Sequence, residues 1–141
     1  MRLLFGHNEI IAEWVHRHIP MMPRPFGNAV GIGVVDENDK PMAGIVFHDY
    51  EPEFKTIQLS AAAITPRWAS HNIVAQILKY PFEELKIHKL WTATQHTNAR
   101  AIKFNEGVGF TREATLRDHF GPGNHAVICR MLDKDYRRRY V

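Results

Sequence analysis

The order of hydrophobic and polar residues along this chain predicts strands and helices that alternate. A short apolar run over residues 1–5 predicts a strand. Apolar residues then recur every three or four positions from Ile10 to Ile19, which is the spacing of a helix with one buried face. We expect Asn8 to cap this helix and Pro20 to end it.

Alternation with a period of two predicts most of the sheet. The expected strands are 29–35, 42–49, 56–64, 89–94, 110–116 and 126–132. The polar stretch Asp36–Pro41 is expected to be the turn between the first two of these strands, and Gly121–Asn124 the turn between the last two. Three consecutive alanines, Ala61–Ala63, lie on the 56–64 strand, so another group can approach its surface closely.

A second helix is expected over Ile73–Lys79, and Pro81 interrupts it because proline has no amide hydrogen to donate. This helix connects the 56–64 strand to the 89–94 strand, and a helical crossover joins strands that run parallel. We therefore predict a mixed α/β fold with antiparallel N-terminal strands, a central parallel pair and flanking helices. In open sheets of this kind a ligand binds at the carboxyl ends of parallel strands.

A third helix is predicted directly after the 89–94 strand. It begins at Asn98, a residue suited to capping a helix, and Gly107 and Gly109 mark its end. Asn98, Ala101 and Asn105 are three or four positions apart and therefore share one face. A polar face of small residues beside a strand is a place where a ligand can lie against the backbone.

Composition indicates a single soluble domain over residues 1–141, since 45% of the residues are hydrophobic and 23% are charged. Three of the 18 Lys and Arg residues are Arg137, Arg138 and Arg139, which leaves 15 basic residues against 15 acidic ones. We expect 133–141 to be a basic, solvated tail, and deletion of Tyr136–Val141 to leave folding and cofactor affinity nearly unchanged. A neutral body argues against nucleic-acid binding, which favours a basic face.

Cysteine and histidine spacing exclude several other classes of site. Cys129 is the only cysteine, so no intramolecular disulfide forms, and we expect a cytoplasmic location. The sequence has no signal-peptide pattern and no apolar run near the ~20 residues that span a membrane. The nine histidines have no metal-binding spacing, and His16 and His18 diverge on a helix, so we expect no metal. No G-x-S-x-G elbow or Walker loop occurs.

The third helix carries a motif that resembles a known family. The pattern N-x-x-A-I-x-x-x-x-x-x-G-F is similar to a helix motif of the Gcn5-related N-acetyltransferases. It consists here of Asn98, Ala101, Ile102, Gly109 and Phe110. The continuation over Thr111–Phe120 resembles the branch that contains the ribosomal-protein N-terminal acetyltransferases.

The resemblance implies that acetyl-CoA is the co-substrate and that it lies at the start of the second helix. In the family this junction is a pyrophosphate loop with two spaced glycines, whereas here Arg67-x-x-Ser70-x-Asn72 stands in its place. A helix N-terminus still offers unpaired amides to a phosphate, and Arg67 adds a charged donor. The resemblance also implies that the central parallel pair splays apart at its C-terminal ends, which leaves backbone groups of Ala62–Ile64 free to pair with pantetheine. The full set of implied cofactor-binding residues is Ala62, Ala63, Ile64, Arg67, Trp68, Ala69, Ser70, His71, Asn72, Asn98, Ala101, Phe104 and Asn105.

The implied reaction moves an acetyl group to a primary amine, of a peptide N-terminus or a small molecule, by direct attack in a ternary complex. Many family members carry a tyrosine at the position of Asn105, whose amide can donate a hydrogen bond but not a proton. Asn105, His96 and His119 are therefore the candidate catalytic residues. The missing glycines and tyrosine leave an alternative open, a non-catalytic CoA-binding or protein-interaction module of the same fold. A homodimer is also left open.

Overall fold

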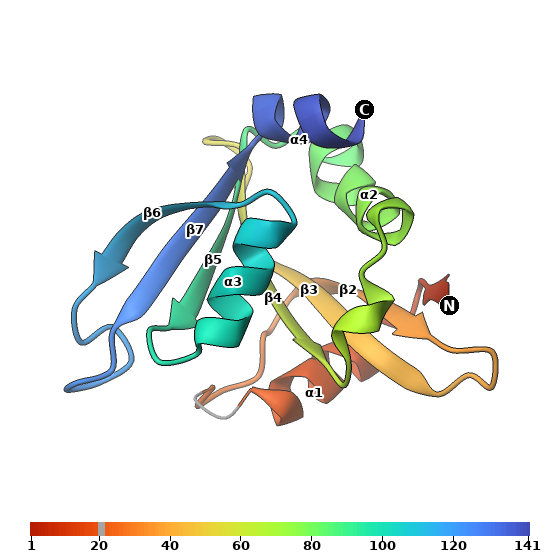
Figure 1. The fold of residues 1–141 in the computed structure, drawn as a ribbon, viewed down its shortest axis with the longest axis horizontal. Coiled ribbons are helices and arrows are strands. Elements are labelled where there is room, and N and C mark those ends of the chain that lie inside the picture. The colour runs from red at the N-terminus through yellow and green to blue at the C-terminus, as the bar shows by residue number, and fades with distance from the viewer. Residues whose placement is uncertain (20–21) are drawn as a thin grey trace.

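The computed structural model describes residues 1–19 and 22–141, and its centre is one sheet of seven strands (Figure 1). The strands are β1 (Arg2–Leu4), β2 (Ala29–Val35), β3 (Pro41–Glu51), β4 (Thr56–Ala63), β5 (Lys89–Gln95), β6 (Thr111–Leu116) and β7 (Ala126–Leu132). The helices are α1 (Asn8–His18), α2 (His71–Lys79), α3 (Ala99–Gly107) and α4 (Asp133–Tyr140), with short turns η1 (Pro66–Trp68) and η2 (Tyr80–Glu84).

The sheet has the order β1-β2-β3-β4-β5-β7-β6, and among its pairs β4 and β5 are parallel while the others are antiparallel. This arrangement confirms the predicted mixed α/β class. β4 and β5 are paired only at their beginnings, from Thr56 opposite Lys89 to Gln58 opposite Trp91. Beyond that point the two strands diverge, although β3 stays paired with β4 as far as Ala63. The predicted splay is therefore present.

Helix α1 covers one face of the sheet, and α2 and α3 cover the other (Figure 1). Close packing of α1 depends on a glycine, because a Cβ at Gly44 of β3 would lie 2.6 Å from Cγ2 of Val15. The prediction that Asn8 caps this helix is wrong. His7 holds the cap position, and the side-chain Oδ1 of Asn8 accepts a hydrogen bond at 3.0 Å from the Gly31 amide, which ties α1 to β2. Pro20, expected to end α1, lies outside the described residues.

The helices on the other face follow the sequence prediction with small changes at their ends. Helix α2 begins at His71 because the Ser70 hydroxyl caps it, accepting from the Ile73 amide at 3.2 Å. Pro81 turns the chain into η2, a π-helical turn, as expected for a residue without an amide hydrogen. Asn98 caps α3 as predicted, accepting from the Ala101 amide at 3.2 Å. Among the described residues, no helix is long and apolar enough to cross a membrane.

The C-terminal segment is not the solvated tail that its charges predicted. It forms α4, and Tyr136 on its inner face is only 1% exposed. The Tyr136 ring stacks on Phe82 of η2 with centroids 4.6 Å apart, and its hydroxyl donates to the Glu83 carboxylate. One turn later, the Tyr140 hydroxyl donates to the Val108 carbonyl. Tyr136 and Tyr140 are four positions apart, so α4 has an aromatic face that composition alone conceals.

Truncation of this inner face is expected to destabilise the protein. Tyr136→Ala removes a buried aromatic ring, and such changes cost about 3–5 kcal/mol of the free energy of unfolding. Chemical denaturation measures the change. Arg138→Ala, an exposed residue on the same helix, is the matched control and should leave stability nearly unchanged. Equal stability of both variants would show that α4 does not contribute to the core.

Candidate functional site

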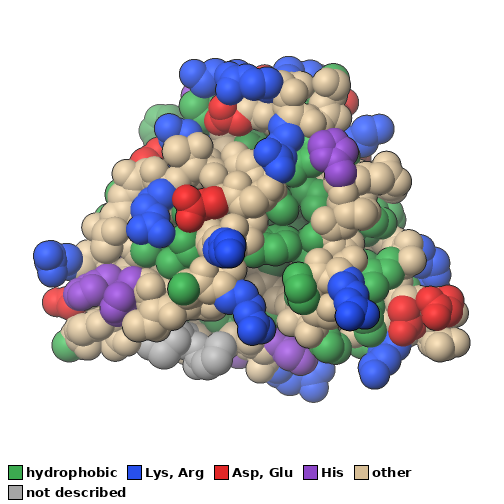
Figure 2. All heavy atoms as spheres, viewed as in Figure 1, with side chains coloured by type: hydrophobic (Ala, Val, Ile, Leu, Met, Phe, Trp, Pro, Cys, Tyr) green, Lys and Arg blue, Asp and Glu red, His purple; other side chains and the backbone are tan. Residues whose placement is uncertain are grey.

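A cleft of about 340 Å³ opens where β4 and β5 diverge, between β4, η1, α2 and α3. Its lining is largely apolar, with Leu59, Trp68, Ile77, Phe104 and Val108 among the larger side chains. In Figure 2 hydrophobic side chains form the centre of this face, with Lys and Arg side chains distributed around them. A narrow apolar channel with cations at its rim suits a ligand that has an apolar or amide-containing arm and an anionic end.

The open edge of β4 supplies backbone groups to this cleft. The Ile64 amide donates to the Met42 carbonyl of β3 at 2.9 Å, so the amides of Ile64 and Ala62 point toward β3. Because backbone groups alternate along a strand, those of Ala61 and Ala63 point the other way, into the gap. Of the three residues expected to pair with pantetheine, only Ala63 has its backbone groups on the open edge. Ala61 is the second, and it was not among the predicted residues.

The cleft passes through the sheet from one face to the other. Leu59 and Ala61 line it from the face that carries α2 and α3, whereas Ala62 lines it from the α1 face. His18, at the end of α1, also lines it and was not predicted. The Nδ1 atom of His18 lies 2.7 Å from the Trp14 carbonyl oxygen, and this acceptor assigns the proton to Nδ1. The lining therefore includes side chains from both faces of the sheet.

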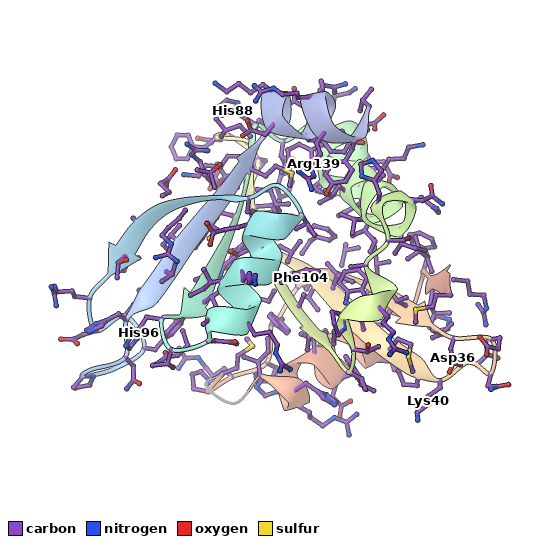
Figure 3. All side chains as sticks on the ribbon, in the orientation of Figure 1. Asp36, Lys40, His88, His96, Phe104 and Arg139 are labelled. Carbon is purple, nitrogen blue, oxygen red and sulfur yellow. The ribbon has the colours of Figure 1, made fainter. Side chains whose placement is uncertain are left out.

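Helix α3 forms one wall of the cleft with the predicted residues Asn98, Ala101, Phe104 and Asn105. Phe104 extends from α3 into the space beside η1, where its ring lies 5.7 Å from that of buried Trp68 (Figure 3). The Asn105 amide donates to the hydroxyls of Thr92 at 3.4 Å and Thr94 at 3.5 Å, both on β5. These two contacts hold the Asn105 side chain between α3 and the divergent strand.

The predicted phosphate residues lie at the rim rather than in the lining. Thr65 Oγ1 accepts from the Arg67 amide at 3.3 Å, and Ser70 Oγ caps α2, so both hydroxyls support the local backbone. The first-turn amides of His71 and Asn72 have no partner within the helix by its geometry. Ala69 connects η1 to this helix start. Arg67 is exposed beside it, so the rim offers two amides and one guanidinium to an anion.

Neither histidine candidate lies in the cleft. His96 packs against His125, with ring centroids 4.7 Å apart, and its Nδ1 accepts from the His125 amide at 3.1 Å. Figure 3 shows it where β5 leads into the turn before α3. His119 is exposed in the turn between β6 and β7, beside Phe120. The lining of the cleft brings Asn105 together with His18, and it includes neither of the other two histidines.

Cys129 and the metal-binding residue types were further candidates for a site in the sequence. Cys129 is fully buried, and burial raises the pKa of its thiol, so it behaves as the small hydrophobic residue that its strand position predicted. Across residues 1–19 and 22–141, no three His, Cys, Asp or Glu side chains gather in a way that holds a metal ion. The polar side chains in the lining of the cleft are those of His18, Thr65, Asn98, Arg100 and Asn105.

Comparison with solved structures identifies the fold. Mutant forms of the spermidine/spermine N-acetyltransferase SpeG from Vibrio cholerae superpose with a TM-score of 0.76 at 14% identity, covering 99% of both chains. A chimera of the Vibrio cholerae enzyme and hSSAT gives a TM-score of 0.77 at 14% identity, covering 98% of both chains. A manganese complex of SpeG gives 0.74 at 16% identity, covering 99% of this chain and 96% of that one. No family model and no curated protein sequence matches the chain.

The chain therefore has the fold of the Gcn5-related N-acetyltransferases, with the mixed sheet, the splayed parallel pair and the flanking helices that the sequence predicted. The structures above are spermidine acetyltransferases, and they give no support to the particular resemblance to the ribosomal-protein branch.

Proposed function

We propose that this protein is an acetyl-CoA-dependent N-acetyltransferase that acts on a primary amine. The observation that carries the proposal is the open edge of β4, where the backbone groups of Ala61 and Ala63 face a cleft with an apolar lining. Pantetheine has two amides and little other polarity, so an unpaired strand edge between hydrophobic walls suits it. The match to spermidine N-acetyltransferases across nearly the whole length of the chain supports the same class of reaction.

The backbone turn at the start of α2 does not need the two loop glycines. Ala69 has φ −92° and Ser70 has φ −63°, so the junction turns without any residue in the left-handed region that favours glycine. The amides of His71 and Asn72 and the guanidinium of Arg67 then remain as donors to the pyrophosphate. These residues bind and orient the co-substrate, and the thioester that it supplies is the acetyl donor.

The chain's own groups account for the remaining chemistry. One of the gap-facing amides of Ala61 and Ala63, the one that pantetheine leaves unpaired, is the donor for the oxyanion that forms when an amine attacks a thioester carbonyl, and such donors contribute a large share of the rate. Asn105 can donate a hydrogen bond to the departing thiolate. The acceptor amine enters from the α1 face, because α2 and α3 form the walls on the other side. Polyamines, peptide N-termini and other small amines all fit this chemistry.

Acetyl-CoA binding at the start of α2 is the first test. Isothermal titration calorimetry should show binding that weakens at least several-fold in Arg67→Ala, because a hydrogen bond to a charged group contributes about 1.5–3 kcal/mol. Arg117→Ala, which removes an exposed arginine near the tip of the β6–β7 hairpin, is the control and should bind as the wild type does. No binding at millimolar acetyl-CoA would overturn the proposal.

The role of Asn105 is tested by turnover. The Asn105→Ala variant loses one hydrogen bond to the thiolate and should leave acetyl-CoA affinity unchanged. Its kcat should fall by less than the ~10²–10⁴-fold that loss of a general acid would cause. Asn105→Tyr should keep or raise kcat, since a phenol can also donate a proton. Equal turnover in the wild type and both variants would exclude Asn105 from the mechanism.

A non-catalytic CoA-binding module is the second candidate, favoured by one contact. The Asn105 amide is already occupied by Thr92 and Thr94, as expected of a structural residue. Transfer of a labelled acetyl group from acetyl-CoA to any amine in a mixed acceptor screen separates the two functions. Binding of acetyl-CoA without transfer to any acceptor would favour the module.

A further inference from the structure

A hydrogen-bonded chain of three side chains lies on the α1 face of β3 and β4. His48 is 7% exposed, and its Nε2 atom lies 2.8 Å from the Ser60 hydroxyl. Its Nδ1 atom lies 2.5 Å from Oδ2 of Asp49. A carboxylate can only accept, so Nδ1 carries the proton and donates it to Asp49. Nε2 is then an acceptor, and the Ser60 hydroxyl donates to it. The order Ser60, His48, Asp49 is that of a proton relay.

The backbone is shaped to make this chain of contacts. In a regular strand Asp49 would point to the face opposite His48. The register between β3 and β4 shifts between His48 and Glu51, and Asp49 has a φ of 54°, in the left-handed region. This irregularity turns the Asp49 carboxylate back toward the imidazole. Bulges that redirect a side chain, and residues held in sparsely populated backbone conformations, occur preferentially near functional sites.

The relay ends beside the gap in the sheet. Ser60 lies on the α1 face, opposite Val46 of β3, two positions after Gln58, where the pairing of β4 with β5 ends. The next residue on that face is Ala62, which lines the cleft. Residues two apart on a strand are roughly 7 Å apart, so the Ser60 hydroxyl lies one strand repeat from the lining. Ser60 is half-buried, so part of the residue remains accessible at this edge of the sheet.

The neighbours of His48 lie on its own strand, on β2 and β4, and in the segment after α1. Ala29 is its cross-strand neighbour on β2. Within residues 1–19 and 22–141, Asp49 is the charged group that contacts it. Gln58 is its neutral cross-strand neighbour on β4, next to Ser60. Phe26, from the segment after α1, covers the imidazole with its ring 4.9 Å away. Phe26 also packs with the cluster of Ile11, Val15 and Val46 that includes Ala62, so the relay and this edge of the cleft share one environment.

We propose that Ser60, His48 and Asp49 remove the proton from the acceptor ammonium group, an inference that rests on the proposed acetyltransferase function. The ammonium gives one proton to the Ser60 oxygen as the Ser60 hydroxyl proton passes to His48 Nε2. His48 becomes an imidazolium that the Asp49 carboxylate stabilises, and it later releases the proton to water. The neutral amine forms the C–N bond as the C–S bond breaks, and its second proton goes to the leaving thiolate. Ser60 is the catalytic residue of this step, and His48 and Asp49 act through it.

The test follows the acetylation rate of spermidine, or of another aliphatic amine found in the acceptor screen, from pH 6 to pH 10. Such amines have a reference pKa near ~10.4, so they are charged at neutral pH. At pH 7, His48→Gln should lower kcat about 10²-fold or more while the acetyl-CoA dissociation constant is unchanged. The difference from the wild type should shrink as the pH rises, because the amine then loses its proton to water. Ser60→Ala should show the same convergence.

Two controls separate the relay from a structural role. His88→Gln changes an exposed histidine directly before β5 and should leave the pH profile unchanged. If His48→Gln folds poorly, Asp49→Asn replaces it. This change affects an exposed residue and preserves the size of its side chain, so the protein should fold normally, and it should still lower the rate at neutral pH. Independently of activity, ¹⁵N NMR of the His48 imidazole should show a protonated Nδ1 and an unprotonated Nε2 in the wild type.

The outcomes are distinguishable. Convergence at high pH together with this tautomer supports the relay. Two results would overturn the relay and leave the acetyltransferase proposal standing. One is a wild type that transfers the acetyl group while the variants lose the same factor in kcat at every pH. The other is a His48 imidazole that carries its proton on Nε2. Acetyl-CoA binding without any transfer by the wild type would overturn both.

Discussion

The whole site depends on β4 remaining paired with β3 beyond the point where β5 diverges from it. β3 pairs with β4 up to Ala63, whereas β5 leaves after Trp91. On its other side β5 is paired with β7 along its whole length, from Lys89 to Gln95. Each strand of the divergent pair is thus stabilised from outside, so their two inner edges can stay apart. Unpaired strand edges readily accept a further extended chain, and here the edge faces a cleft rather than another protein.

The surrounding elements maintain this gap. Helix α1 packs tightly on β3 through Gly44, so the half of the sheet that ends in β4 forms one unit. Helix α3 bridges to β5 through Asn105. Helix α4 closes the end of the molecule, where Arg139 (Figure 3) donates to the Gly107 carbonyl at the end of α3. Tyr140 stacks on His71 at the start of α2. The C-terminal helix thereby connects both walls of the cleft.

Local patterns in the sequence predicted the sheet, the parallel pair and the cap at Asn98, because each depends on residues a few positions apart. The features that were missed depend on contacts between distant segments. Asn8 looked like a helix cap, yet its side chain reaches Gly31. Tyr136 lay within a run of charges, and its burial depends on Phe82, more than fifty positions away. The register between β3 and β4 determines that the Ala61 backbone faces the gap and that His48 contacts Ser60. The periodicity of the sequence does not determine this register.

The central claim is that the open edge of β4 holds the co-substrate, and amide hydrogen exchange tests it directly. Residue-resolved exchange, measured by NMR with and without saturating acetyl-CoA, compares neighbouring amides on one strand. The Ala61 and Ala63 amides, which face the gap, should become strongly protected on binding, whereas the Ala62 amide, which faces β3, should change little. Protection of Ala62 without Ala61 and Ala63, or no change on β4 when acetyl-CoA binds, would contradict the account.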